Sequence, residues 1–181
     1  MLAAALVCAS CVSPPPDPPS PLAFEDVTAT AGIRVKKDTW GTFGAAWADF
    51  DNDGHLDLFV GRHSAVPALF RSTGRGTFVE VTKAAGLLVG FLPENLNLLD
   101  RHGCAWGDAN GDGRADLYCS TGAEGGKGSD PNQLFVNQGN GTFAESAQQL
   151  GVDDGPGRGR GVNWIDYDRD GQLDLYVANT K

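Results

Sequence analysis

One acidic loop, nine residues long, occurs three times in this chain and constrains its fold more than any other feature. The copies begin at Asp49, Asp108 and Asp166, so they lie 59 and 58 residues apart. Each has Asp at positions one, five and nine, Asp or Asn at position three, Gly at position six, and a Trp two residues before position one. Self-similarity at a fixed period indicates a repeat array, in which each unit packs on its neighbours.

The side chains of this loop predict a metal site. Four oxygen-bearing groups within nine residues repel one another when ionised, and a bound hard cation removes that repulsion. Ca²⁺ accepts oxygen ligands in flexible geometry, and the glycine at position six permits the sharp turn that lets alternate positions converge. Position seven would contribute its backbone carbonyl. The predicted ligands of three Ca²⁺ ions are Asp49, Asp51, Asp53, His55, Asp57, Asp108, Asn110, Asp112, Arg114, Asp116, Asp166, Asp168, Asp170, Gln172 and Asp174.

The loop has two other interpretations. The helical calcium-binding hand needs Glu at position twelve, where this chain has Val60, Cys119 and Val177. The residues after position nine are β-rich and too short for a helix, so each loop is predicted to join two strands. An Asx- and Gly-rich hairpin that binds nothing is the other alternative, and three copies at constant spacing disfavour it.

The three sites are not equivalent in charge. The middle loop has Asn110 where the others have Asp51 and Asp168, so its Ca²⁺ site is predicted to be the weakest. The chain carries a net charge of −9, and 11 of its 23 acidic residues lie in the three loops. Three Ca²⁺ ions would cancel most of that excess. This acidity argues against nucleic acid as a partner.

The amino terminus has the composition of an export signal. Residues 1–12 are predicted to be a signal peptide or a lipoprotein signal, with Cys11 as the possible lipid anchor and ordinary signal cleavage as the alternative. Residues 13–21 contain six prolines and are predicted to be an extended linker. The expected location is therefore secreted, periplasmic or on the cell surface.

The rest of the chain predicts an all-β fold. Each unit is predicted to be strand, acidic loop, strand, turn, strand, Gly-rich hairpin, strand, which makes a four-stranded antiparallel propeller blade. The repeats are placed at residues 41–83, 100–148 and 159–181, and the third stops after its second strand. A strand within 22–35 matches the fourth strand of a blade and is expected to close the last blade. The chain is thus expected to be an open piece of a propeller.

The Trp-x-Asp-x-Asp/Asn-x-Asp-Gly-x-x-Asp loop, the Leu-Phe/Tyr-Val strand after it, and the turn Asn-x-Gly-Asn-Gly-Thr-Phe resemble FG-GAP/VCBS repeats. Such repeats occur in integrin α-subunit propellers and in cartilage acidic protein-like and ASPIC/UnbV-type secreted proteins. The resemblance covers nearly everything after Leu22. It implies a calcium-stabilised, usually seven-bladed propeller used for adhesion or binding, and calcium ligands at positions one, three, five and nine of each loop. This chain has only about two and a half blades of that arrangement.

Two further features concern packing. The regular placement of Trp47, Trp106 and Trp164 favours a structural role between blades over a ligand-stacking role. Cys104 and Cys119 flank the middle loop on neighbouring predicted strands, which brings them within reach of a disulfide. Two buried free thiols are the alternative.

Two functions from different classes follow. The first is an extracellular or cell-surface calcium-binding repeat module for adhesion or for protein or carbohydrate binding, without catalysis. The alternative is the propeller domain of a secreted polysaccharide lyase or hydrolase. Unpaired His, Tyr and Arg side chains at the central mouth of the propeller would favour that alternative. The sequence contains no nucleophile elbow, zinc helix motif or phosphate loop, and we expect no enzymatic activity.

Overall fold

The fold is described from a computed structural model, which covers residues 23–35, 42–62, 65–89, 100–122, 130–155 and 157–180. The predicted signal and lipid-anchor segment at 1–12 and the linker at 13–21 lie outside these residues. Within them, no helix combines the length and the apolar character needed to pass through a bilayer.

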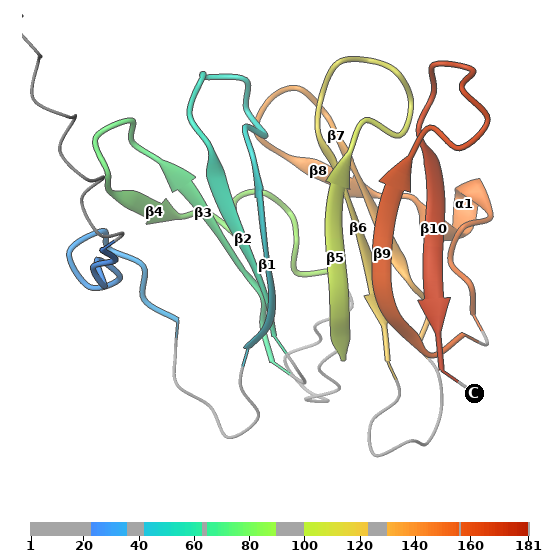
Figure 1. Ribbon diagram of the computed structural model, residues 1–181, viewed down its shortest axis with the longest axis horizontal. Coiled ribbons are helices and arrows are strands. Elements are labelled where there is room, and N and C mark those ends of the chain that lie inside the picture. Colours follow the sequence, from blue (N-terminus) through green and yellow to red (C-terminus); the bar gives the residue numbers. More distant parts are fainter. Residues whose placement is uncertain are drawn as a thin grey trace, which may run out of the picture.

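Two complete blades and one half blade stand side by side (Figure 1). The first sheet contains β1 (Thr42–Ala48), β2 (Asp57–Arg62), β3 (Ala68–Ser72) and β4 (Phe78–Glu80), in that order. The second contains β5 (Arg101–Gly107), β6 (Asp116–Thr121), β7 (Gln133–Asn137) and β8 (Phe143–Glu145). The third is the hairpin of β9 (Gly159–Ile165) and β10 (Asp174–Asn179). All pairings are antiparallel, so the predicted blade architecture is confirmed.

The main core lies between the first two blades. Phe59 of β2 and Leu69 of β3 pack against Leu117 of β6 and Phe135 of β7. Alternate residues of β2 face the opposite way, and Leu58 and the other side chains of that face form a second cluster with the amino-terminal segment. Every residue of β2 and β6 is buried, because each strand is covered on both faces.

The tryptophans link each blade to the one before it. The indole N–H of Trp106 donates to the carbonyl of Ala46, and that of Trp164 donates to the carbonyl of Ala105, both at 3.2 Å. Gly107 permits the second contact, because a Cβ atom there would lie 2.5 Å from the Trp164 ring. Trp106 and Trp164 therefore have the structural role that their spacing predicts. Trp47 is 51% exposed and packs edge-on against Phe78.

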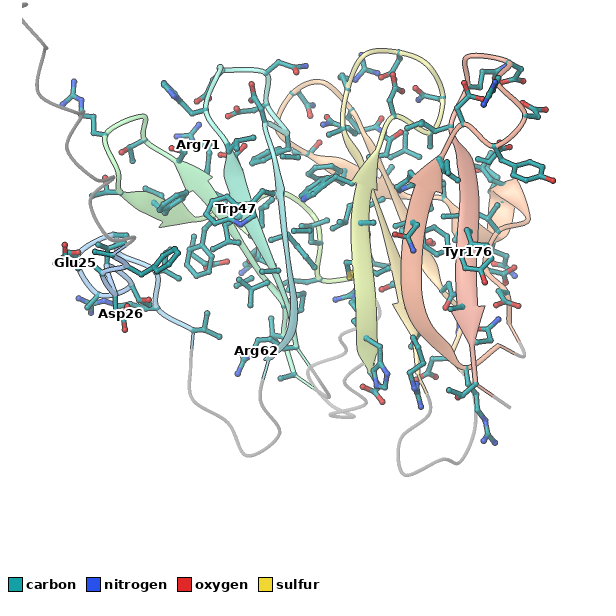
Figure 2. The ribbon with its side chains drawn as sticks, in the orientation of Figure 1. Glu25, Asp26, Trp47, Arg62, Arg71 and Tyr176 are labelled. Carbon is teal, nitrogen blue, oxygen red and sulfur yellow. A yellow bond between two sulfur atoms is a disulfide. The ribbon has the colours of Figure 1, made fainter. Side chains whose placement is uncertain are left out.

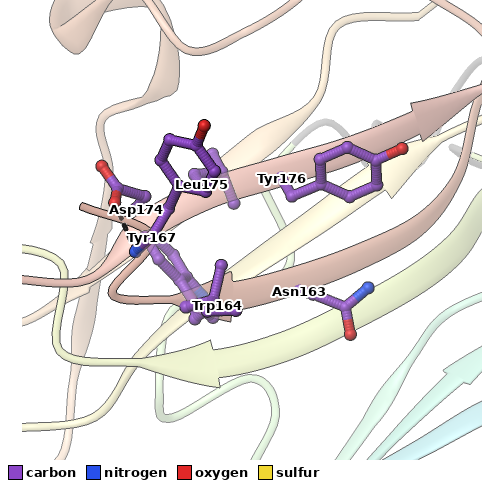
Figure 3. Close-up of a pocket in the computed structure, with 7 residues that line it drawn as sticks. Asn163, Trp164, Tyr167, Asp174, Leu175 and Tyr176 are labelled. Carbon is purple, nitrogen blue, oxygen red and sulfur yellow. Dashed lines mark hydrogen bonds between the residues drawn. The ribbon is translucent and has the colours of Figure 1, made fainter. Parts of the chain in front are cut away.

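The outer face of the third blade is open. Tyr176 is 62% exposed, whereas Phe59 and Tyr118, which hold the same repeat position, are 1% and 0% exposed. Asn163, Tyr167 and Tyr176 are among the residues that line a pocket at this blade (Figure 3). Figure 2 places Trp47 and Tyr176 on opposite sides of the three-blade stack.

Residues 22–35 were expected to hold a closing strand, and the structure differs. The described part, residues 23–35, has no strand and instead turns at residues 28–32. Ala31 accepts the amide N–H of Phe78, just as Ala85 accepts that of Phe143 in the next unit. The segment thus repeats the turn that follows β4. Phe24 remains exposed, because in the described residues no strand lies beside it to pair with its backbone.

The second blade ends in a short helix. Its last strand, β8, ends at Glu145, and a four-residue helix, α1 (Ala147–Leu150), follows it. Gly151 ends the helix in the left-handed conformation, with φ 72°. Ala147 is buried in the cluster between the second and third blades. The amide N–H groups of Gly151 and Val152 donate to carbonyl groups of this short helix.

Cys104 and Cys119 form a disulfide, which is one of the two alternatives that the sequence left open. They are directly paired across β5 and β6, in the register that Ala45 and Val60 hold in the first blade. The bond closes a segment with a sequence separation of 15, which contains the whole middle loop.

The double substitution Cys104→Ala, Cys119→Val should reduce the free energy of unfolding by about 3 kcal/mol, because it removes a cross-link over about 15 residues. The first blade has Ala and Val at these positions, so packing is preserved. Urea denaturation under non-reducing conditions measures the change. An unfolding midpoint equal to that of the unmodified chain would contradict it.

Trp106→Phe should destabilise the chain by about 1–2 kcal/mol, because it removes an interblade hydrogen bond and part of a packed ring. Trp47→Phe removes the same atoms from a half-exposed site and should cost less than about 0.5 kcal/mol. Equal losses in urea denaturation would mean that the contact of Trp106 with Ala46 does not stabilise the blades.

Candidate metal centres

The three acidic loops lie at the same end of the stack (Figure 1). The first loop, Asp49–Asp57, joins β1 to β2; the middle loop, Asp108–Asp116, joins β5 to β6; the third loop, Asp166–Asp174, joins β9 to β10. In each case the loop connects the two strands that begin a blade. Interblade packing of those strands therefore sets where the loops lie.

Backbone N–H groups fold each loop around the carboxylate at position one. Asp49 accepts from the amides of Asp53 at 2.9 Å and Gly54 at 2.8 Å. The amide of the position-six glycine donates in the same way to Asp108 at 2.8 Å and to Asp166 at 3.1 Å. That glycine has φ between 80° and 90° in all three loops, a conformation that side-chain-bearing residues rarely adopt.

The first loop brings three carboxylates together. One oxygen from each of Asp49, Asp51 and Asp53 lies within 4.8 Å of the others. Oδ1 of Asp51 is buried without a hydrogen-bond partner. Burial, followed by repulsion from Asp53, raises the pKa of Asp51. Arg71 lies 3.8 Å from the other oxygen of Asp51, with half of its own side chain in solvent. A cation among these oxygens would relieve both the burial cost and the repulsion.

The third loop has a comparable cluster. Oxygens of Asp166, Asp168 and Asp174 lie within 4.8 Å of one another, and Oδ1 of Asp166 is buried without a hydrogen-bond partner. Asp170, the predicted ligand at position five, lies outside this group of three. Its Oδ1 accepts the amide of Gln172 at 2.8 Å.

The middle loop differs from the other two. With Asn110 at position three, no group of three acidic oxygens forms there in the described part of the chain. Burial opposes ionisation of Asp108, but backbone N–H groups led by that of Gly113 outweigh it and lower its pKa. Arg114 forms an ion pair with Asp112 at 2.5 Å. The sequence interpretation assigned only the backbone carbonyl of Arg114 to the site and missed this side-chain contact.

The carboxylate at position nine ties the loop to the third strand of its blade. Asp57 is fully buried and accepts the amides of Phe50 at 3.1 Å and Ser72 at 2.7 Å. Asp116 accepts those of Ala109 and Asn137 in the same way. Asp174 is exposed and accepts the amide of Tyr167 (Figure 3). Burial raises the pKa of both Asp57 and Asp116. Their predicted role as metal ligands stays a prediction beside this structural one.

The sequence profile of the FG-GAP-like repeat matches residues 49–119 and 108–177, which together include all three loops. The chain belongs to the FG-GAP-like repeat family. Each of the two matches to the family profile begins at a position-one aspartate and ends in the strand that follows the next loop. The antiparallel sheets described above are the propeller blades of such repeats.

Relatives of this FG-GAP-like repeat chain match less than half of its length. Cartilage acidic protein 1 of Mus musculus is 46% identical over 65 residues, which is 36% of this chain and 9% of that protein. Cartilage acidic protein 1 of Homo sapiens is 43% identical over 65 residues. That of Xenopus tropicalis is 40% identical over 77 residues, 42% of this chain and 11% of that protein. The matched stretch thus spans about a tenth of the length of these relatives.

Asp57→Ala should destabilise the chain by about 2–4 kcal/mol, because two buried amides lose a charged acceptor. Asp174→Ala removes the same group from the exposed third loop, where it accepts one amide, and should cost less than about 1 kcal/mol. Urea denaturation in the presence of a chelator separates this structural effect from metal binding. Equal losses would show that Asp57 has no role beyond that of a loop carboxylate.

Proposed function

We propose that this chain is a calcium-stabilised, non-catalytic repeat module that works outside the cell by binding a protein or carbohydrate partner. Calcium binding is supported mainly by the first loop. There the carboxylates of Asp49, Asp51 and Asp53 lie close together, and one buried oxygen of Asp51 has no hydrogen-bond partner. The third loop has a comparable cluster of Asp166, Asp168 and Asp174, in which the buried oxygen without a partner belongs to Asp166. Membership of the FG-GAP-like family supports the binding-module part.

Calcium suits these loops better than magnesium. The loop oxygens come from short side chains on partly exposed loops, and Ca²⁺ tolerates irregular geometry and a high ligand number. Mg²⁺ requires near-ideal octahedral geometry and keeps much of its own water. A bound Ca²⁺ would neutralise the loop carboxylates and fix the ends of the first strand pair in each blade. Its role would be structural.

An oxidising location outside the cytosol is supported by the disulfide between Cys104 and Cys119, because such bonds persist in secreted, periplasmic and cell-surface proteins. The concentration of extracellular calcium is also high enough to fill weak sites. Anchoring through a lipid on Cys11 stays a prediction.

A side-chain contact between β5 and β9, near the ends of these strands that lie away from the acidic loops, supports a structural role for the residues there. His102 of β5 contacts Asp100 through Nε2 at 2.8 Å and Arg160 of β9 through Nδ1 at 2.8 Å. The contact with Arg160 links the second and third blades, whereas Asp100 directly precedes β5 in the second.

Calcium titration tests the proposal. Adding millimolar Ca²⁺ to chelator-treated protein should release or absorb heat in calorimetry and raise the melting temperature. Asp51→Asn should raise the melting temperature of the metal-free protein, because it removes a buried charge repelled by Asp53, and it should reduce the Ca²⁺-dependent increase. An unchanged melting temperature at millimolar Ca²⁺ would remove the metal from the proposed function.

A further inference from the structure

Position seven carries a different residue in each loop, namely His55, Arg114 and Gln172. We propose that the guanidinium of Arg114 is a built-in cation for the middle loop, so that this loop is neutralised by its own chain and binds Ca²⁺ far more weakly than the first and third loops. This inference rests on the proposed calcium-binding function. The inference identifies Arg114 as a residue that determines which of the loops bind Ca²⁺.

Arg114 engages both oxygens of the position-five carboxylate. Its amide donates to Oδ1 of Asp112 at 3.0 Å, and its guanidinium donates to Oδ2 at 2.5 Å. In the other loops the amide contact is kept, from His55 to Asp53 at 2.9 Å and from Gln172 to Asp170 at 2.8 Å. Neither His55 nor Gln172 carries a permanent charge. In the first loop, one oxygen of the equivalent Asp53 lies within 4.8 Å of oxygens of Asp49 and Asp51. In the middle loop, Arg114 occupies Oδ2 of Asp112.

The guanidinium is held in this position by the neighbouring hairpin. Nε of Arg114 donates to the carbonyl of Asn137 at 3.2 Å. The stem of the side chain lies over Gly139, where a Cβ atom would be 3.3 Å from Cδ of Arg114. A Ca²⁺ ion that used Oδ2 of Asp112 would have to break the ion pair and then displace a seated side chain.

The charge of the middle loop agrees with this role. The first loop has four carboxylates, and the middle loop has three, because Asn110 replaces an acid. One of those three is paired with Arg114, so the attraction for a divalent ion falls further. The first loop also has an arginine nearby, but Arg71 lies 3.8 Å from Asp51 and is half exposed. In the third loop Arg169 is exposed at position four.

A reciprocal exchange at position seven tests the proposal in the full chain. Arg114→Gln gives the middle loop the residue of the third, and Gln172→Arg does the reverse. Calorimetric Ca²⁺ titration counts the sites, and the backbone amide resonances of Gly54, Gly113 and Gly171 report each loop separately by NMR. We expect the Gly113 resonance of the unmodified chain to respond at a Ca²⁺ concentration at least about tenfold higher than the other two.

Arg114→Gln should bring the Gly113 response down toward the range of the other loops, by about tenfold or more. Gln172→Arg should weaken the Gly171 response. Arg169→Gln is the matched control: it removes a loop arginine that is exposed, and it should change the Gly171 response by less than about threefold. Far-UV circular dichroism verifies that each variant is folded.

The outcomes separate the inference from the function on which it rests. Similar Ca²⁺ affinity at all three loops, unchanged by Arg114→Gln, would overturn the role of Arg114 and leave the calcium module intact. A middle loop that stays weak in Arg114→Gln would also overturn it and assign the weakness to Asn110. The absence of any Ca²⁺ response at Gly54 and Gly171 would overturn the proposed function itself.

Discussion

Burial between neighbouring blades is the constraint on which the rest of the structure depends. Along β2, Leu58 and Phe59 point to opposite faces, and each belongs to a different apolar cluster. A single sheet of this kind exposes two apolar faces and needs a neighbour on each side. On the open face of the third blade, Tyr176 is exposed to solvent. The equivalent Tyr118 of the second blade is fully buried. Stacking also fixes the first two strands of every blade, and with them the position of every acidic loop.

On that scaffold the backbone of the loop is constant and its electrostatics vary. The amide of the position-six glycine donates to the position-one carboxylate in all three copies. The carboxylates at the other positions differ in whether a positively charged side chain pairs with them. Asp51 in the first loop keeps a buried oxygen without a partner, whereas Asp112 in the middle loop is paired with Arg114. One loop shape can therefore either attract a divalent ion or be neutralised from within.

The sequence predicted the parts that depend on period and local chemistry. The 59- and 58-residue spacing located the strands. The positions of Cys104 and Cys119 left a disulfide and two free thiols as alternatives, and the structure has the disulfide. The closing strand within 22–35 was not found in the described residues, because strand formation there depends on a partner that local alternation cannot reveal. The Arg114 contact was missed because long side chains have many rotamers, and only the neighbouring Asn137 carbonyl and Gly139 select one of them.

Hydrogen bonds also connect each loop to strands outside it. Asp57 at the end of the first loop accepts the amide of Ser72 at the end of β3, so the loop closes correctly only when the third strand is in place. The side-chain amide of Asn137, from the second blade, donates to the carbonyl of Phe50 in the first loop at 2.7 Å. Phe50 itself packs against Trp106 and Phe143 of that blade. The cation proposed for the first loop would favour the same backbone arrangement as the docking of the second blade. By linkage, binding of that cation would strengthen the docking, and the docking would strengthen the binding.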